Sequence, residues 1–347
     1  MVPNSYMKKQ RRKSMNNFKK IGLSALAGSL AAFSANAAEM SVSGSAKVTY
    51  FNGDGSEVTG NPFGMNTSLG FTGSGDVNGY ETTLFITAAD QFGGMSSASL
   101  AVDLGDLGKL TFDQGVGAGG ISTIDDKTPS AYEEIWDSLD AVAGDENGLV
   151  GGGNSGVFVY ANTFMGSNFT AQFGKGASAA NTDGGPSGAN GASSWDFAIT
   201  NSDLAEGLTV GGGYGEIANT SAGDANAASD DTDAHYTAFV TYSMSGVTVG
   251  YQESVVENNT AGGADEQAQA WSIAANLMDG LSVSYGEREV EFMNPSAAHV
   301  TEDMEGVALA YTMGSAKLSV QKNESSNNGG TANAVDENLE VALSLSF

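Results

Sequence analysis

Eight carboxylate side chains lie close together in the segment 115–155, accompanied by a single base, Lys127. The acids are Asp125, Asp126, Glu133, Glu134, Asp137, Asp140, Asp145 and Glu146. Carboxylates that lack partner bases create a negative field, which concentrates cations. Grouped in this way, they predict electrostatic selection of ions rather than a covalent reaction.

The same segment carries a helical pattern. Thr128 and Pro129 are typical of an N-cap followed by proline at the first helical position. Apolar and acidic side chains then fall on two different faces at helical spacing, with Tyr132, Ile135, Trp136, Leu139 and Val142 on one face and Glu133, Asp137 and Asp140 on the other. We predict an amphipathic helix that lays its apolar side on a wall and holds its carboxylates toward water. The alternative is a solvated helix on an external loop.

Motifs that would indicate an enzyme are weak. Residues 115–120 match the glycine pattern of dinucleotide-binding loops, but no β-α-β pattern surrounds them, so we interpret them as the entry to a loop. His235 and His299, the two histidines, lie far apart and offer little basis for a zinc site or a Ser-His-Asp triad. We expect no enzymatic activity and no cofactor.

Calcium is the one ion for which a candidate site exists. Hard oxygen ligands are offered by Asp224, Asp230, Asp231 and Asp233. These acids lack the spacing of an EF-hand, so a solvated outer loop is the favoured interpretation. Structural Ca²⁺ at Asp230, Asp231 and Asp233 is the alternative.

Strands must position the acidic segment. In the last ten residues, Leu339, Val341, Leu343, Leu345 and Phe347 alternate with polar or small residues, and this period of two indicates a strand with one apolar face. The same period predicts sixteen strands, at about 40–52, 65–74, 80–89, 96–104, 108–114, 156–163, 168–174, 194–202, 208–216, 235–243, 247–253, 268–278, 281–289, 305–313, 316–323 and 338–347. Short Gly, Asp and Ser turns alternate with longer polar loops, of which 115–155 is the longest.

Residues 1–37 are predicted to be a secretory signal peptide. Seven basic residues precede the apolar run 21–33, and Ala35 and Ala37 supply the small residues of a cleavage site. Translation could start at Met1, Met7 or Met15. Without this segment the charge is 7 − 41 = −34, which excludes nucleic acid as a partner and would repel anionic lipid unless divalent cations bridged the two.

The chain lacks an apolar stretch of about 18 residues, the length that a membrane-spanning helix needs. A closed barrel needs apolar residues only at alternate positions. We therefore predict an all-β, sixteen-stranded antiparallel transmembrane β-barrel over residues 38–347. Leu281, Val283 and Tyr285 should face lipid or another subunit, and the small polar residues between them should face a water-filled lumen. In residues 156–160 both faces are bulky, which suggests a subunit contact or an inward loop. A soluble β-sandwich is the competing architecture.

These features together resemble a general bacterial porin of the alphaproteobacterial type. The resemblance rests on the signal peptide, the sixteen strands, the third outer loop with its stretches 124–129 and 132–134, and the end Leu345-Ser346-Phe347. It implies a homotrimer in the bacterial outer membrane, among lipid and lipopolysaccharide, with the third loop folded inward as a constriction. The constriction acids would be Asp125, Asp126, Glu133, Glu134, Asp137 and Asp140.

The chain departs from the porin pattern in its bases. A porin wall typically presents several arginines opposite the loop acids, whereas residues 38–347 contain one, Arg288. Strand alternation places Lys47, Arg288 and Lys317 on the opposing lumen wall and Lys322 on the outside. A channel with few wall bases is expected to prefer cations.

Three functions remain open at this point. The first is a water-filled channel for passive diffusion of small hydrophilic solutes and ions. The second is a barrel enzyme, for which the two histidines are a poor basis. The third is a structural or adhesive outer-membrane barrel without an open pore. Conductance in planar bilayers separates them, because only the first predicts large, steady, ohmic steps.

Overall fold

The computed structural model describes residues 39–53, 61–89, 96–117, 119–139, 155–175, 193–218, 232–259, 264–293 and 299–347. The predicted signal peptide lies outside these residues. Within them, none of the helices has the length and hydropathy that crossing a membrane requires.

The described residues form sixteen strands, and each corresponds to a predicted one. They are β1 (Glu39–Gly53), β2 (Phe63–Val77), β3 (Tyr80–Ala89), β4 (Ser97–Asp103), β5 (Lys109–Gln114), β6 (Ser155–Phe164), β7 (Ser167–Gly174), β8 (Ser194–Asn201), β9 (Leu208–Ala218), β10 (Thr232–Met244), β11 (Val247–Glu257), β12 (Asp265–Met278), β13 (Leu281–Met293), β14 (Val300–Met313), β15 (Ala316–Ser326) and β16 (Val335–Ser346). The sheet prediction is confirmed.

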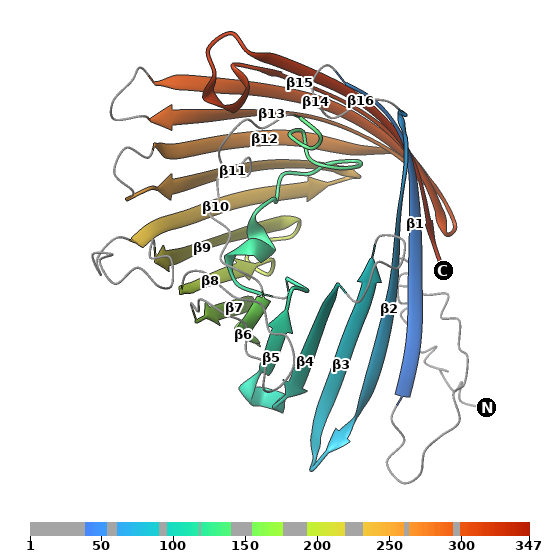
Figure 1. Cartoon of the computed structure of the whole chain (residues 1–347), viewed down its shortest axis with the longest axis vertical. Coiled ribbons are helices and arrows are strands. Elements are labelled where there is room, and N and C mark those ends of the chain that lie inside the picture. The colour runs from blue at the N-terminus through green and yellow to red at the C-terminus, as the bar shows by residue number, and fades with distance from the viewer. Residues whose placement is uncertain are drawn as a thin grey trace, which may run out of the picture.

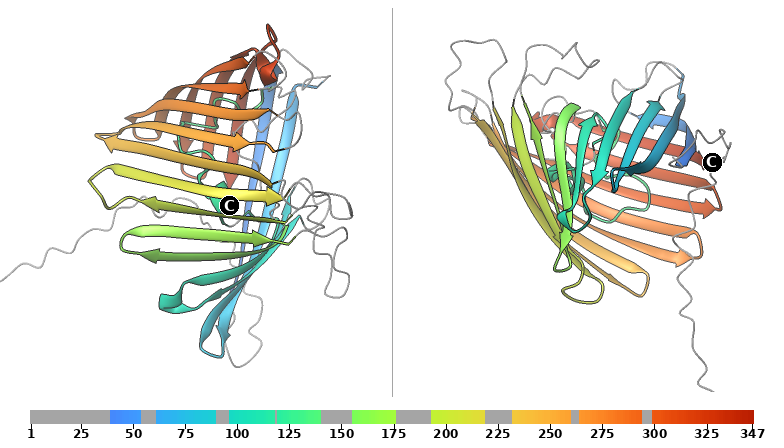
Figure 2. Two further views of the ribbon diagram at one scale, coloured as in Figure 1. Left: turned by 90° about the vertical axis from the view of Figure 1, so that its left-hand side faces the viewer. Right: turned by 90° about the horizontal axis from the view of Figure 1, so that it is seen from below.

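The strands close into a single antiparallel barrel. Each strand pairs with its neighbours in the chain, and β1 pairs with β16 (Figure 1). Phe347, the last residue, extends this seam, because its backbone N–H and C=O both bond to Gly44 at 2.9 and 2.8 Å. Two further views show one continuous wall (Figure 2). Closure leaves no free sheet edge, which is what a strand structure needs in lipid.

The two faces of the wall alternate as predicted. On β14, Leu309 is 42% exposed on the outside, whereas Ala308 and Ala310 are 4% and 1% exposed. The inner wall is rich in small or polar side chains such as Ser284 and Gln321. A polar inner face and an apolar outer face are those of a membrane-spanning barrel with a wet interior.

Buried apolar residues form three small clusters where the chain after β5 meets the inner wall. One contains Ile121, Ile124, Ala198 and Phe239; the second contains Leu139, Ala268, Val290 and Met304; the third contains Ala131, Ala308 and Ala310. Each cluster joins residues of the 119–139 segment to inward residues of the strands. The core of this barrel is therefore the contact between loop and wall.

Candidate functional site

The chain between β5 and β6 crosses the inner surface of the barrel from β8 toward β16 (Figure 1). Gly119 lies against Val159 of β6, and a 3₁₀ turn, η3 (Ile121–Ile124), follows it. Val157 and Val159 are 1% and 2% exposed, so the inward bulk of β6 lies under this loop. From here on, 'third loop' means the described part of the segment 115–155 before β6, which is residues 115–117 and 119–139.

Wall side chains hold the first half of the third loop by its backbone. Asp196 of β8 accepts a hydrogen bond from the Ile121 N–H at 2.7 Å. Gln252 of β11 donates to the Ile124 carbonyl at 2.8 Å and accepts from the Lys127 N–H at 2.7 Å. One amide thus satisfies two backbone groups of the turn.

The second half is held in the same way by four more strands. Ser272 donates to the Pro129 carbonyl at 2.7 Å, and Ser284 accepts from the Ala131 N–H at 2.9 Å. Gln321 and Asn338 donate to the carbonyls of Glu134 and Ser138 at 2.6 and 2.8 Å. The contacts therefore extend from β12 to β16.

The predicted amphipathic helix after Pro129 is wrong. Residues 129–139 form bends and turns, with Ser138 at a positive φ of 60°. The physical reason lies in the hydrogen bonds: the wall amides and hydroxyls take the backbone groups that a helix would pair internally, so the loop can remain irregular while buried. Ile135, Trp136 and Leu139 still face the wall, as the pattern indicated, whereas Val142 lies outside the described residues.

A notch in the wall receives Ile135. Gly286 and Gly306 face each other in the β13–β14 register. A Cβ atom at Gly306 would lie 2.8 Å from Ile135, and one at Gly286 would lie 3.2 Å from it. The absence of both side chains allows the close approach of the loop.

Trp136 covers the single arginine of the described wall. The Arg288 guanidinium lies 4.3 Å from the centre of the Trp136 ring and is 2% exposed. Such a stack combines cation–π attraction with burial of both side chains. Arg288 therefore lies between the wall and Trp136 of the third loop. It does not face the loop acids across an open channel.

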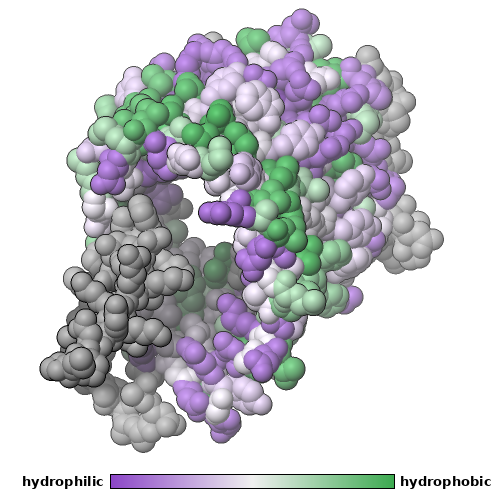
Figure 3. Space-filling model, turned by 180° about the vertical axis from the view of Figure 1, so that it is seen from behind, coloured by the Kyte–Doolittle hydropathy of each residue, from purple (hydrophilic) through white to green (hydrophobic). Residues whose placement is uncertain are grey.

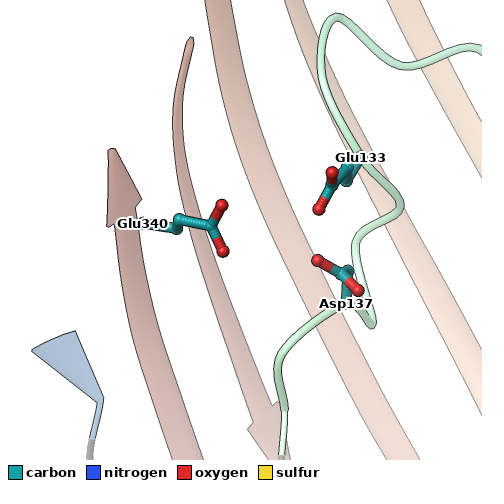
Figure 4. A group of neighbouring side chains, drawn as sticks. All are labelled: Glu133, Asp137 and Glu340. Carbon is teal, nitrogen blue, oxygen red and sulfur yellow. The ribbon is translucent and has the colours of Figure 1, made fainter. Parts of the chain in front are cut away.

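Three carboxylates gather beside this stack. Glu133 and Asp137 come from the third loop and Glu340 from β16, and they point toward one another (Figure 4). One carboxylate oxygen from each of the three residues lies within 4.8 Å of the other two. Glu340 also accepts a hydrogen bond from the Tyr132 hydroxyl at 2.6 Å. Hard oxygen donors so close together could hold a cation such as Ca²⁺.

The two wall lysines lie beside this group. Lys47 forms a 2.9 Å ion pair with Glu133. The ammonium groups of Lys47 and Lys317 lie 5.8 and 5.4 Å from the centre of the Tyr132 ring. The bases expected on the opposing wall are thus placed against the acids, and Lys47 neutralises one of them.

Burial and interactions among the acids shift the pKa values of the loop carboxyl groups, which lie outside the membrane-spanning strands. Burial, together with Asp126, raises the pKa of Glu134 to about 7. Burial, together with Glu133, raises the pKa of Asp137 to about 7. Burial also raises the pKa of Asp125. For Glu133, burial is outweighed by the hydrogen bonds with Asp137 and Lys47, so its pKa is lowered.

The remaining candidate residues are not brought into this group. Asp126 accepts from the N–H and hydroxyl of Thr128 at 3.2 Å, within a local turn. Asp233 accepts from the Asn259 N–H at 2.8 Å. His235 is fully buried, and His299 contacts Glu291 at 3.1 Å. Several proposed sites lie outside the described residues, namely Asp140, Asp145, Glu146, Asp224, Asp230 and Asp231.

Sequence reasoning missed Glu340. Its position in the polar phase of the last strand, between Leu339 and Val341, was a signal that it faces inward. Its contact with Tyr132 could be predicted only from the register of β16 and the path of the third loop. The glycine notch was missed for the same reason.

No protein-family model and no curated protein matches the chain. Among solved structures, it resembles a loop-deletion mutant of OmpT, an outer membrane protein of Vibrio cholerae, at a TM-score of 0.65 and 12% identity, over 89% of this chain and 99% of that one. It also resembles an anion-selective porin from Comamonas acidovorans, at 0.61 and 12% identity, over 89% and 100%. The fold is that of bacterial outer-membrane porins. A mutant of the Rh. blastica porin matches at 0.56 with the same identity and coverage.

The porin fold accounts for the arrangement described above. A closed sixteen-stranded barrel with an apolar outer face is a multi-pass β-barrel of the outer-membrane type. At 12% identity the likeness establishes the fold, and the alphaproteobacterial type stays a prediction.

Proposed function

We propose that the protein is an outer-membrane porin, a water-filled channel for passive diffusion of small hydrophilic solutes and ions. The observation that carries this proposal is a closed barrel with a polar inner wall, along which the third loop is held by hydrogen bonds. A space-filling view is hollowed at the centre of the molecule (Figure 3). A loop held inside such a barrel narrows the path without filling it.

We further propose that the channel prefers cations. Residues 119–139 carry five acids and one base. Their charge acts in a narrow, partly desolvated space, where it is felt more strongly than in bulk water. One structural neighbour is an anion-selective porin, so the fold alone does not decide the sign. The preference must come from the residues of this chain.

Planar bilayers test both statements. Purified protein should give steady ohmic current steps. In a KCl gradient, the sign of the reversal potential should show that K⁺ permeates more readily than Cl⁻. Absence of steps would favour a structural or adhesive barrel. Current steps with a reversal potential that shows greater Cl⁻ permeability would support the channel function and refute the cation preference.

We infer that the protein performs no covalent chemistry. Within the described residues, His235 is fully buried and His299 bonds to a carboxylate rather than to a hydroxyl. A hydrolytic triad needs a histidine that is hydrogen-bonded to a nucleophile.

Cation preference is expected to weaken when the pH is lowered from about 8 to about 6. Glu134 and Asp137 have a pKa of about 7, so they are mostly ionised at the upper pH and mostly protonated at the lower one. Reversal potentials in a fixed KCl gradient measure the change. The double variant Glu134→Gln, Asp137→Asn should show a flatter pH response. An identical pH response in wild type and variant would refute this assignment.

We propose a homotrimer whose contact surface lies on β1–β7. The outward side chains there are mainly apolar, for example Met65, Leu100, Phe158 and Phe173, each 47% to 54% exposed. On β9–β14, by contrast, outward tyrosines donate hydrogen bonds to carboxylates, as Tyr285 does to Glu287 at 2.7 Å. Strands that face lipid need polar groups at headgroup level, whereas strands in a subunit contact do not.

The trimer is expected to dissociate when charge enters this surface. Replacing Leu100 and Phe158 by Lys should convert a trimer into a monomer in native mass measurements in mild detergent. The matched control is Leu309→Lys with Val307→Lys on β14, which should leave the trimer intact. A monodisperse wild-type monomer in several detergents would contradict the proposal.

The carboxylate-bearing outer face of β9–β14 is proposed to face outer-membrane lipid and lipopolysaccharide. Tyr214 donates to Glu216 at 2.8 Å, and Tyr285 donates to Glu305 at 3.0 Å. Aromatic rings with polar ends suit the membrane interface. Anionic headgroups would need divalent cations to approach these acids.

A further inference from the structure

A pocket of about 490 Å³ lies between the third loop and the inner wall, toward the short-turn ends of β6–β10. The loop contributes Thr123, Ile124 and Lys127 to its lining. Its size is within the range of small-molecule sites. The loop acids Glu133 and Asp137 are not part of it.

The lining combines hydroxyl groups with an apolar floor. Thr200, Thr209 and Thr241 line the pocket, and their hydroxyls have no hydrogen-bond partner among the described residues. Ala198 and Phe239 form apolar lining and are themselves 1% and 6% exposed. Phe239 is held in place because it packs against Ile121 and Ile124 of the third loop.

Charge narrows the choice of ligand. No lining residue is acidic, although the chain contains 41 Asp and Glu residues, so the pocket offers a cation no carboxylate, and Lys127 is its one charged side chain. A purely apolar ligand would leave the hydroxyls without partners, which is unfavourable. A solute with hydroxyls on its edge and C–H groups on its face satisfies both kinds of lining.

We propose that this pocket binds a neutral, polyhydroxylated solute of monosaccharide size, so that such solutes pass the channel through a saturable step. The proposal rests on the proposed channel function and adds a binding site to it. Diffusion through a plain aqueous pore would be proportional to solute concentration at all concentrations.

The test uses the full-length protein in planar bilayers with D-glucose as the probe. We expect glucose to reduce the ion current in a saturable manner, beyond the reduction given by ethylene glycol oligomers of equal size. Channels that conduct while glucose and the oligomers reduce the current equally would overturn the pocket proposal and leave the channel function standing.

Variants locate the site. Thr209→Val with Thr241→Val removes two hydroxyls at nearly constant volume, and the glucose concentration for half block should rise about tenfold. Thr248 lies on the inward face of β11, outside the pocket. The control Thr248→Val should therefore leave the glucose concentration for half block unchanged. Equal block in all three proteins would refute the assignment. Much tighter block by gluconate than by glucose, lost in Lys127→Met, would refute the neutral class of ligand.

Discussion

Replacing Glu133, Asp137 and Glu340 together by Gln, Asn and Gln is expected to lower the permeability of K⁺ relative to Cl⁻ at least about fivefold. Two unit charges about 4 Å apart interact by about 1 kcal/mol even in bulk water, which is about a fivefold change in ion partition, and more strongly in a narrow lumen. The amides keep the size and can still accept the Tyr132 hydrogen bond. Reversal potentials measure the ratio, and the change should be larger at low ionic strength.

A matched control removes the same number of charges from the outside of the barrel. Glu257, Glu289 and Asp303 are exposed on outward strand positions, and their amide variants should change the ratio much less. If the two triple variants behave alike, ion preference is set by the overall charge of the protein. The three inner carboxylates would then have no special role.

Strand positions were predictable because the signal is local. Each strand alternates within its own sequence, and every predicted strand is present. The strand ends were less predictable. β14 begins at Val300 instead of 305, and β16 at Val335 instead of 338. In these extensions the outward positions Asp303 and Glu337 are charged, so the apolar period of the outer face is absent although the hydrogen-bond ladder continues.

The candidate site was predictable only in part. The loop acids stand out by composition, but the partner Glu340 lies more than 200 residues from Tyr132 in sequence. Helical periodicity after Pro129 correctly indicated one buried face and wrongly indicated a helix, because the pattern carries no record of wall amides such as Gln321. Contacts of this kind depend on the strand register, which a single sequence does not contain.

Replacing Trp136 by Ala is expected to raise the single-channel conductance and the open-channel noise. The variant loses the ring that covers Arg288 and packs on the Leu139 cluster. Removing a partly buried aromatic ring costs about 2–3 kcal/mol, which lowers the ratio of docked to undocked loop about 30- to 150-fold. Trp271→Ala is the control, since that ring is 42% exposed on the outer face.

A disulfide should reverse this effect. The Oγ atoms of Ser130 in the loop and Ser284 in β13 lie 3.5 Å apart, and the chain contains no cysteine. Cysteines at these two positions can form one bond after a small shift. In the Trp136→Ala background, oxidation should restore the lower conductance and quiet current, and reduction should abolish them. Each single cysteine should have no such effect. If the oxidised pair forms and the conductance stays high, movement of the third loop is not what widens the channel.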